Sequence, residues 1–145
     1  MTITPREAFQ RGTDTFNAHD IDGFAAVLDD DVVFVAPGPT TGAGKAACAE
    51  FFAGWFRAFP DARVDVHDVH FIDDVAVEVG TSSGTHDGVF HSPAGDVPAT
   101  GRRVSLDYLQ VPHFRDGKHA SFNLMFDRLL MLEQLGLIPA SAPAA

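Results

Sequence analysis

Cysteine and basic residues are scarce in this sequence of 145 residues. The single cysteine, Cys48, excludes an intramolecular disulfide and a cluster of several thiolates around a metal. Only 10 Lys and Arg residues stand against 20 Asp and Glu residues, which gives a formal net charge of −10 at pH 7. Because a molecule of this charge repels polyanions, we expect no nucleic-acid partner.

Long apolar runs are also missing. No stretch approaches the roughly 18 apolar residues that cross a bilayer, and residues 1–10 lack a basic start followed by an apolar segment. We therefore expect a cytoplasmic protein with no membrane partner. A hydrophobic content of 46%, with 13 Phe, suffices for a core. We expect one domain over residues 1–139 and a frayed tail over 140–145.

The N-terminal part of the chain carries helix signals. Thr4-Pro5-Arg6-Glu7 combines a capping threonine, a proline at the first helical position and a glutamate that can reach back. Asp20 can cap a second, short helix, and residues 32–35 are typical of a strand. A third helix is predicted from about 43 to 59. Since apolar side chains surround most of its circumference, we expect it to be buried.

After residue 61 the hydrophobic period changes from helical to alternating. This pattern predicts strands at about 62–72, 75–84, 102–114 and 118–126, a Gly- and Pro-containing loop at 88–101, and a last helix at 128–135. Helices followed by a sheet meander favour an α+β fold, in which a curved, mostly antiparallel sheet packs on the N-terminal helices. The apolar concave side of such a sheet suits a small-molecule cavity.

Several short segments together carry a family resemblance. They are Asn17-Ala18-His19-Asp20, Phe59-Pro60-Asp61, Gly84-Thr85-His86-Asp87-Gly88, Pro98-Ala99-Thr100-Gly101-Arg102-Arg103, Asp116-Gly117-Lys118, Asp127 and Gln134-Leu135-Gly136. In this order and spacing they resemble the SnoaL-like polyketide cyclases of the nuclear transport factor 2-like superfamily. The resemblance implies a cone-shaped α+β barrel, a homo-oligomer (dimer or tetramer), and a cavity for an aromatic polyketide. It also implies ring closure by an intramolecular aldol reaction with acid–base catalysis, no cofactor and no metal.

Position by position, the resemblance places the catalytic carboxylate at Asp127 and its supporting histidine at His113. Two departures from the family pattern are Ser121-Phe122-Asn123, where an acid-His-Trp triplet is common, and a longer loop at 91–97. Other chemistry on the same barrel therefore stays an alternative: hydroxylation, isomerisation, epoxide hydrolysis, or binding of a small molecule without turnover.

Two physical interpretations of Asp127 remain open. Burial beside Met125 and Phe126 would raise its pKa toward working pH, as acid–base catalysis requires. However, Asp127 directly precedes the helix predicted at 128–135, where aspartate is a favoured N-cap, and capping would stabilise the carboxylate.

The turn at Asp116-Gly117 decides whether His113 and Asp127 share a face. A two-residue turn would place His113 opposite Ala120 and on the other side from Asp127, whereas a three-residue loop starting at Arg115 would unite them. We predict the three-residue loop, with His113, Ser121, Asn123, Met125 and Asp127 on one face.

The remaining candidates are substrate-binding positions. We predict that Phe51, Trp55, Tyr108 and Phe126 supply flat aromatic walls, and that Ser121, Asn123 and Met125 contact the substrate. His67 and His70 point to opposite faces of a strand, so no metal site is predicted there. The sequence assigns no role to His86, His91 or Asp107.

Overall fold

The N-terminal helices and the first hairpin begin the fold. The computed structural model describes residues 3–38, 40–92 and 94–140. Its first elements are α1 (Pro5–Asn17), α2 (Ile21–Ala26), β1 (Leu28–Ala36), β2 (Thr40–Ala43) and α3 (Lys45–Ala58). Both predicted helix starts are confirmed. Thr4 and Glu7 form a reciprocal capping box, and Asp20 Oδ1 accepts a hydrogen bond from Gly23 N at 2.9 Å.

The later elements follow the predicted order with three differences. They are β3 (Arg63–Ile72), β4 (Val75–Thr85), β5 (Phe90–Ser92), β6 (Gly95–Val97), β7 (Arg103–Gln110), β8 (His113–Arg115), β9 (Lys118–Phe126) and α4 (Arg128–Gln134). The loop predicted at 88–101 contains the hairpin β5–β6, β2 was not predicted, and the strand predicted at 102–114 is interrupted at Pro112, which has no N–H to donate. Of the predicted frayed tail, residues 141–145 lie outside the described residues.

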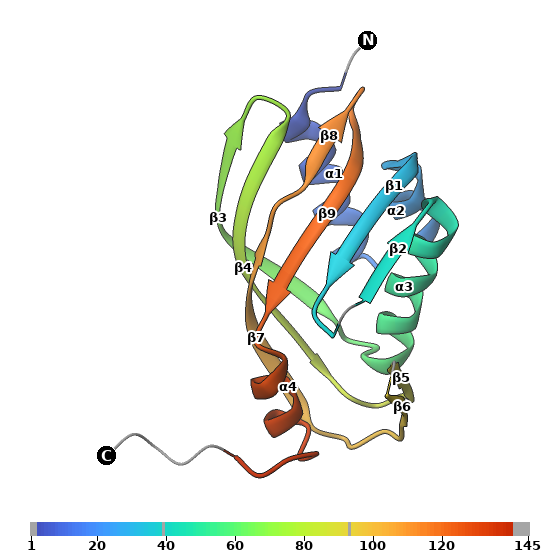
Figure 1. Cartoon of the computed structure of the whole chain (residues 1–145), viewed down its shortest axis with the longest axis vertical. Coiled ribbons are helices and arrows are strands. Elements are labelled where there is room, and N and C mark those ends of the chain that lie inside the picture. The colour runs from blue at the N-terminus through green and yellow to red at the C-terminus, as the bar shows by residue number, and fades with distance from the viewer. Residues whose placement is uncertain (1–2, 39, 93, 141–145) are drawn as a thin grey trace.

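One mixed sheet forms the body of the molecule. Its strand order is β2-β1-β9-β7-β4-β3, with β8 pairing to β4 and β9, and β1 runs parallel to β9 while the other pairs are antiparallel. Figure 1 shows α1, α2 and α3 on one side of the curved sheet and α4 beyond the end of β9. The sheet is not a closed barrel, but the cone-like α+β architecture confirms the predicted fold class.

The buried core leaves a hollow between the helices and the sheet. Phe16, Phe24, Leu28 and Phe122 pack at one end of this space, and a second cluster around Phe59 packs at the other. The prediction that α3 is buried holds only in part. Cys48 and Ala58 are fully buried, whereas the aromatic residues between them are half-buried. The hollow explains this difference for Phe51, Phe52 and Trp55, because these three rings border it. No helix in the described part of the chain is long and apolar enough to cross a membrane.

Candidate active site

A cavity of about 680 Å³ lies between the helices and the concave face of the sheet. Many aromatic rings line it, as in ligand sites that bind flat molecules. They come from the helices and from the strands: Phe9, Phe16, Phe24, Phe51, Phe52, Trp55, Phe90, Tyr108, Phe122 and Phe126. Exposed residues of α3, β5, β6 and α4 also border the cavity, so its open end lies there.

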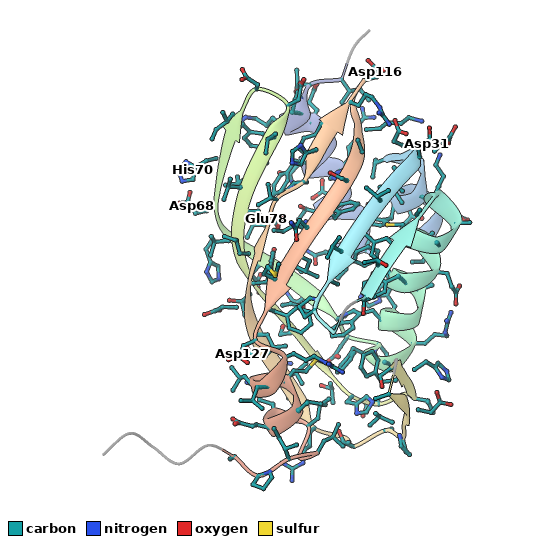
Figure 2. All side chains as sticks on the ribbon, in the orientation of Figure 1. Asp31, Asp68, His70, Glu78, Asp116 and Asp127 are labelled. Atoms are coloured by element: carbon teal, nitrogen blue, oxygen red, sulfur yellow. The ribbon has the colours of Figure 1, made fainter. Side chains whose placement is uncertain are left out.

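A buried carboxyl group stands on this aromatic wall. Glu78, in the middle of β4, is 4% exposed and borders the cavity; Figure 2 labels it within the body of the molecule. Tyr108 Oη donates a hydrogen bond to Glu78 Oε2 at 2.6 Å, and Gln110 Nε2 donates to Glu78 Oε1 at 3.3 Å. The two partners lie on β7, where Gln110 pairs directly with Glu78 and Tyr108 pairs with Gly80. The sheet register itself therefore assembles this trio.

The absence of a side chain at Gly80 is required for the contact. A Cβ atom built at Gly80 would lie 2.6 Å from Tyr108 Oη. Any larger residue would displace the Tyr108 hydroxyl from Glu78, because real Cβ atoms do not approach so closely. The trio of Glu78, Tyr108 and Gln110 therefore depends on a fourth position, which carries no functional group.

Burial and hydrogen bonding act on Glu78 in opposite directions. Desolvation raises the pKa of the Glu78 carboxyl, and the hydrogen bonds from Tyr108 and Gln110 oppose this rise without cancelling it. Burial, followed by the Glu78 charge, raises the pKa of the Tyr108 hydroxyl, which therefore stays protonated and donates. A carboxyl whose pKa is shifted toward neutrality can both accept and return a proton.

His119 is a second polar group on the lining, and it is uncharged near neutral pH. The residue is 3% exposed, and burial lowers its pKa to about 4, opposed by a hydrogen bond to Ala8. Since a carbonyl oxygen can only accept, His119 Nε2 donates to Ala8 O at 3.0 Å. The ring also lies close to Gly12, whose Cβ would be 2.8 Å from Nε2. His119 thus fixes α1 against β9 as a neutral donor.

The cavity contains four of the nine predicted site residues. Phe51, Trp55, Tyr108 and Phe126 border it. The other five residues do not: Ser121, Asn123, Met125 and His113 lie on the opposite face of the sheet, and Asp127 lies just before α4. On β9 the side chains that point inward are His119, Phe122, Leu124 and Phe126.

Asp127 occupies the capping position. It is exposed at the start of α4, as Figure 2 shows, and its side chain accepts a hydrogen bond from Leu130 N at 3.0 Å. Of the two interpretations of this residue, the geometry corresponds to the N-cap. Asp127 itself does not border the cavity.

The predicted three-residue loop is wrong, although His113 and Asp127 still share a face. Arg115 pairs with Lys118, so Asp116-Gly117 is a two-residue turn, with φ of 50° and 73° at the two positions, as type I′ hairpins require. A bulge at Ala120 then shifts the register, and His113 pairs with Ser121. The shared face is the outer one, where both His113 and Asp127 are exposed.

Comparison with known proteins gives the family. The family model described as SnoaL-like domain matches residues 9–122, which is most of the chain. The chain belongs to the SnoaL-like family. No curated protein matches it.

Solved structures similar to this SnoaL-like chain include proteins named for several different reactions. A proposed SnoaL-like polyketide cyclase from Jannaschia sp. CCS1 is 21% identical with a TM-score of 0.80, and the match covers 93% of each chain. AclR, a proposed hydroxylase from Streptomyces galilaeus, is 23% identical with a TM-score of 0.79 over 95% of this chain and 84% of that chain. An LEH-like epoxide hydrolase from M. tuberculosis is 17% identical with a TM-score of 0.71 over 92% and 90%. At these identities the likeness shows the fold, and the reaction must be argued from the site.

Two residues to which the sequence assigned no role, His86 and Asp107, have hydrogen-bond partners in this SnoaL-like chain. His86 is fully buried beside Thr100, whose N–H donates to His86 Nδ1 at 3.2 Å. Asp107 is exposed and accepts a hydrogen bond from Thr81 Oγ1 at 2.8 Å.

Burial raises the pKa of Cys48 to about 12, so this thiol is not a nucleophile at neutral pH. Across the described residues, no three His, Cys, Asp or Glu side chains converge as they would around a metal ion.

Glu78 is the functional candidate that sequence reasoning missed. One signal was available, because Glu78 interrupts the apolar run Val75-Ala76-Val77 and Val79 on a predicted strand. An acid at the same parity as Ala76 faces the buried side. His119 gave no comparable signal, since its inward direction depends on the bulge at Ala120.

Proposed function

We propose that this protein is an acid–base enzyme that needs no cofactor or metal and closes a ring in an aromatic polyketide intermediate by an intramolecular aldol reaction. One observation carries the proposal: the buried carboxyl of Glu78 borders an aromatic cavity and is held there by Tyr108 and Gln110. Membership of the SnoaL-like family is compatible with this chemistry, and one structural neighbour is a proposed polyketide cyclase.

The proposed reaction needs one proton acceptor that later becomes a donor. Glu78 takes a proton from a substrate carbon that lies between two carbonyl groups, which leaves an enolate. The enolate carbon forms a bond to a second carbonyl carbon of the same molecule, and the electron pair of that C=O bond moves to its oxygen. Glu78 then returns its proton to this alkoxide, so the carboxylate is regenerated and no other reactant is consumed.

Tyr108 and Gln110 act as positioning residues in this proposal. Their hydrogen bonds fix both oxygens of Glu78, and the Tyr108 hydroxyl prevents the carboxyl from rotating into the wall. The aromatic lining holds a flexible side chain of the substrate folded over its ring system, which places the reacting carbons near each other.

The test is made in two stages on a fused aromatic compound that carries a 1,3-dicarbonyl side chain. Exchange of the proton between the carbonyls for deuterium, followed by NMR in D₂O, reports proton removal alone. Chromatography of the cyclised product reports the whole reaction. We expect both to be accelerated by the protein and to survive exhaustive chelation. Exchange without ring closure would favour an isomerase, and binding without exchange would favour a binding module.

We also propose that the protein is a homo-oligomer, a dimer or a tetramer. Five aliphatic or thioether side chains on the outer sheet face are at least 40% exposed: Val33, Val35, Val79, Leu109 and Met125. Leu109 pairs with both Met125 and Val79, and β1, which carries Val33 and Val35, pairs with β9, so this patch spans four adjacent strands. Light scattering tests the proposal, since Leu109→Lys should yield monomers if the patch is the interface and leave the mass unchanged if it is not.

A further inference from the structure

The charged side chains at the open end of the cavity are not equivalent. Arg57 Nη2 lies 2.6 Å from Glu50 Oε1, and His91 Nδ1 lies 2.6 Å from Asp96 Oδ1. Arg128 also borders the cavity, but it has no ion pair and no side-chain hydrogen bond with any described residue. The guanidinium group of Arg128 therefore keeps its full charge and its N–H donors.

Packing, and not a carboxylate, holds this guanidinium group in place. A Cβ atom built at Gly38 would lie 3.0 Å from Arg128 Cζ and 3.1 Å from Nη1, so the Arg128 head group rests against the backbone of Gly38. Gly38 has a φ of 87°, a conformation that side-chain-bearing residues rarely adopt. The guanidinium group thus packs against the turn after β1. Because this packing already restricts the side chain, Arg128 would lose less conformational entropy on binding a ligand.

Charge is therefore distributed along the cavity in a defined order. The acid Glu78 is buried, aromatic rings from the helices and the sheet line the interior, and the unpaired cation Arg128 is exposed at the open end. A ligand carboxylate near Glu78 would face a like charge in a poorly hydrated space, whereas one near Arg128 would find a planar donor pair that fits it.

We propose that the cavity selects planar aromatic acids, and that Arg128 binds the ligand carboxylate at the open end while the ring system fills the aromatic interior. The proposal rests on the proposed function in that it takes this cavity as the substrate site, and it adds the substrate class. The net charge of −10 opposes anion binding only weakly at this point, because exposed charges beyond about 8 Å are screened at physiological ionic strength.

Binding of two fluorescent probes tests the proposal without requiring turnover. The probes are anthracene-2-carboxylate and its uncharged analogue anthracene-2-carboxamide, measured by fluorescence anisotropy at pH 7.5. We expect the wild-type protein to bind the carboxylate at least about tenfold more tightly than the carboxamide, the range of a charge-assisted hydrogen-bonded pair. In Arg128→Gln this preference should disappear while carboxamide binding stays unchanged.

Arg102→Gln is the matched control. Arg102 is also exposed and also rests against a glycine of positive φ, Gly136, but it does not border the cavity. The preference for the carboxylate should survive in this variant. Equal binding of the two probes by the wild type, failure of both to bind, or a preference that persists in Arg128→Gln would each overturn the proposal. Because Glu78→Gln should keep the preference whatever its effect on turnover, failure of the proposed reaction can be told apart from failure of this inference.

Discussion

The two faces of β9 differ in what they present and in what holds them in place. The inner face carries His119, Phe122, Leu124 and Phe126 toward the cavity, whereas Ser121, Asn123 and Met125 lie on the outer face, and Asp127 follows the strand as the N-cap of α4. The inner face is apolar apart from one neutral histidine. The buried carboxyl of the cavity, Glu78, comes from β4 and is hydrogen-bonded from β7. Polar residues on a strand of this fold therefore do not by themselves mark the face that borders the cavity.

The largest expected effect separates the two faces by their carboxyl groups. Glu78→Gln keeps the shape and the hydrogen-bond acceptor of the side chain but removes its proton chemistry. We expect deuterium exchange and ring closure to fall by on the order of 100-fold or more, the range for loss of a general acid–base group. The measurement is the rate of each step under saturating substrate, with circular dichroism to check the fold.

Asp127→Asn is the matched variant on the outer face. Asparagine caps helices as well as aspartate does, so α4 should be preserved and the rates should stay within about twofold of the wild type. A 100-fold loss in Asp127→Asn together with normal rates in Glu78→Gln would restore the assignment made from the family resemblance and reject the one made from the cavity.

The second effect concerns the loss of folding stability in acid that results from the burial of His119 on the inner face. Burial lowers the folded-state pKa of His119 to about 4 from an ordinary value of 6.5. Between these two pKa values His119 is protonated in the unfolded chain but not in the folded protein, so folding stability is lost as pH falls from 6.5 through 4. Relative to His119→Gln, the wild type should lose on the order of 3 kcal/mol over this interval. Urea unfolding at several pH values measures the difference.

A histidine on the outer face supplies the control for this measurement. His113 is exposed and makes no contact with the cavity, so His113→Gln should reproduce the pH dependence of the wild type. If His113→Gln flattens the curve and His119→Gln does not, the acid sensitivity arises on the outer face.

Much of the fold followed from local signals in the sequence. The capping box at Thr4, the cap at Asp20 and the change of hydrophobic period after residue 61 each depend on neighbouring residues, and each appears in the structure. The aromatic walls were also predictable, because large apolar rings on an apolar helix and on inward strand positions are buried between the helices and the sheet.

The direction of the site could not be predicted in the same way. One bulge at Ala120 moves every later side chain of β9 to the opposite face, and nothing in the local sequence marks it. The Glu78 trio depends on the pairing of β4 with β7, whose partners lie about 30 positions apart in the chain. The resemblance selected Asp127 by its position in the sequence, whereas the register of the strands determines which side chains point into the cavity.

The smallest expected effect tests the outer-face role of Asp127 directly. Its carboxylate accepts a hydrogen bond from Leu130 N, one of the amides that the first turn of α4 would otherwise leave without an intrahelical partner. Asp127→Ala removes this acceptor and should lower the free energy of unfolding by about 1 kcal/mol, whereas Asp127→Asn should change it by only a few tenths. Since the site is exposed, neither variant should alter binding of the anthracene probes. Thermal unfolding and probe anisotropy on the same samples give both quantities. A loss of probe binding in Asp127→Ala at unchanged stability would show that the side chain serves the cavity and not the helix.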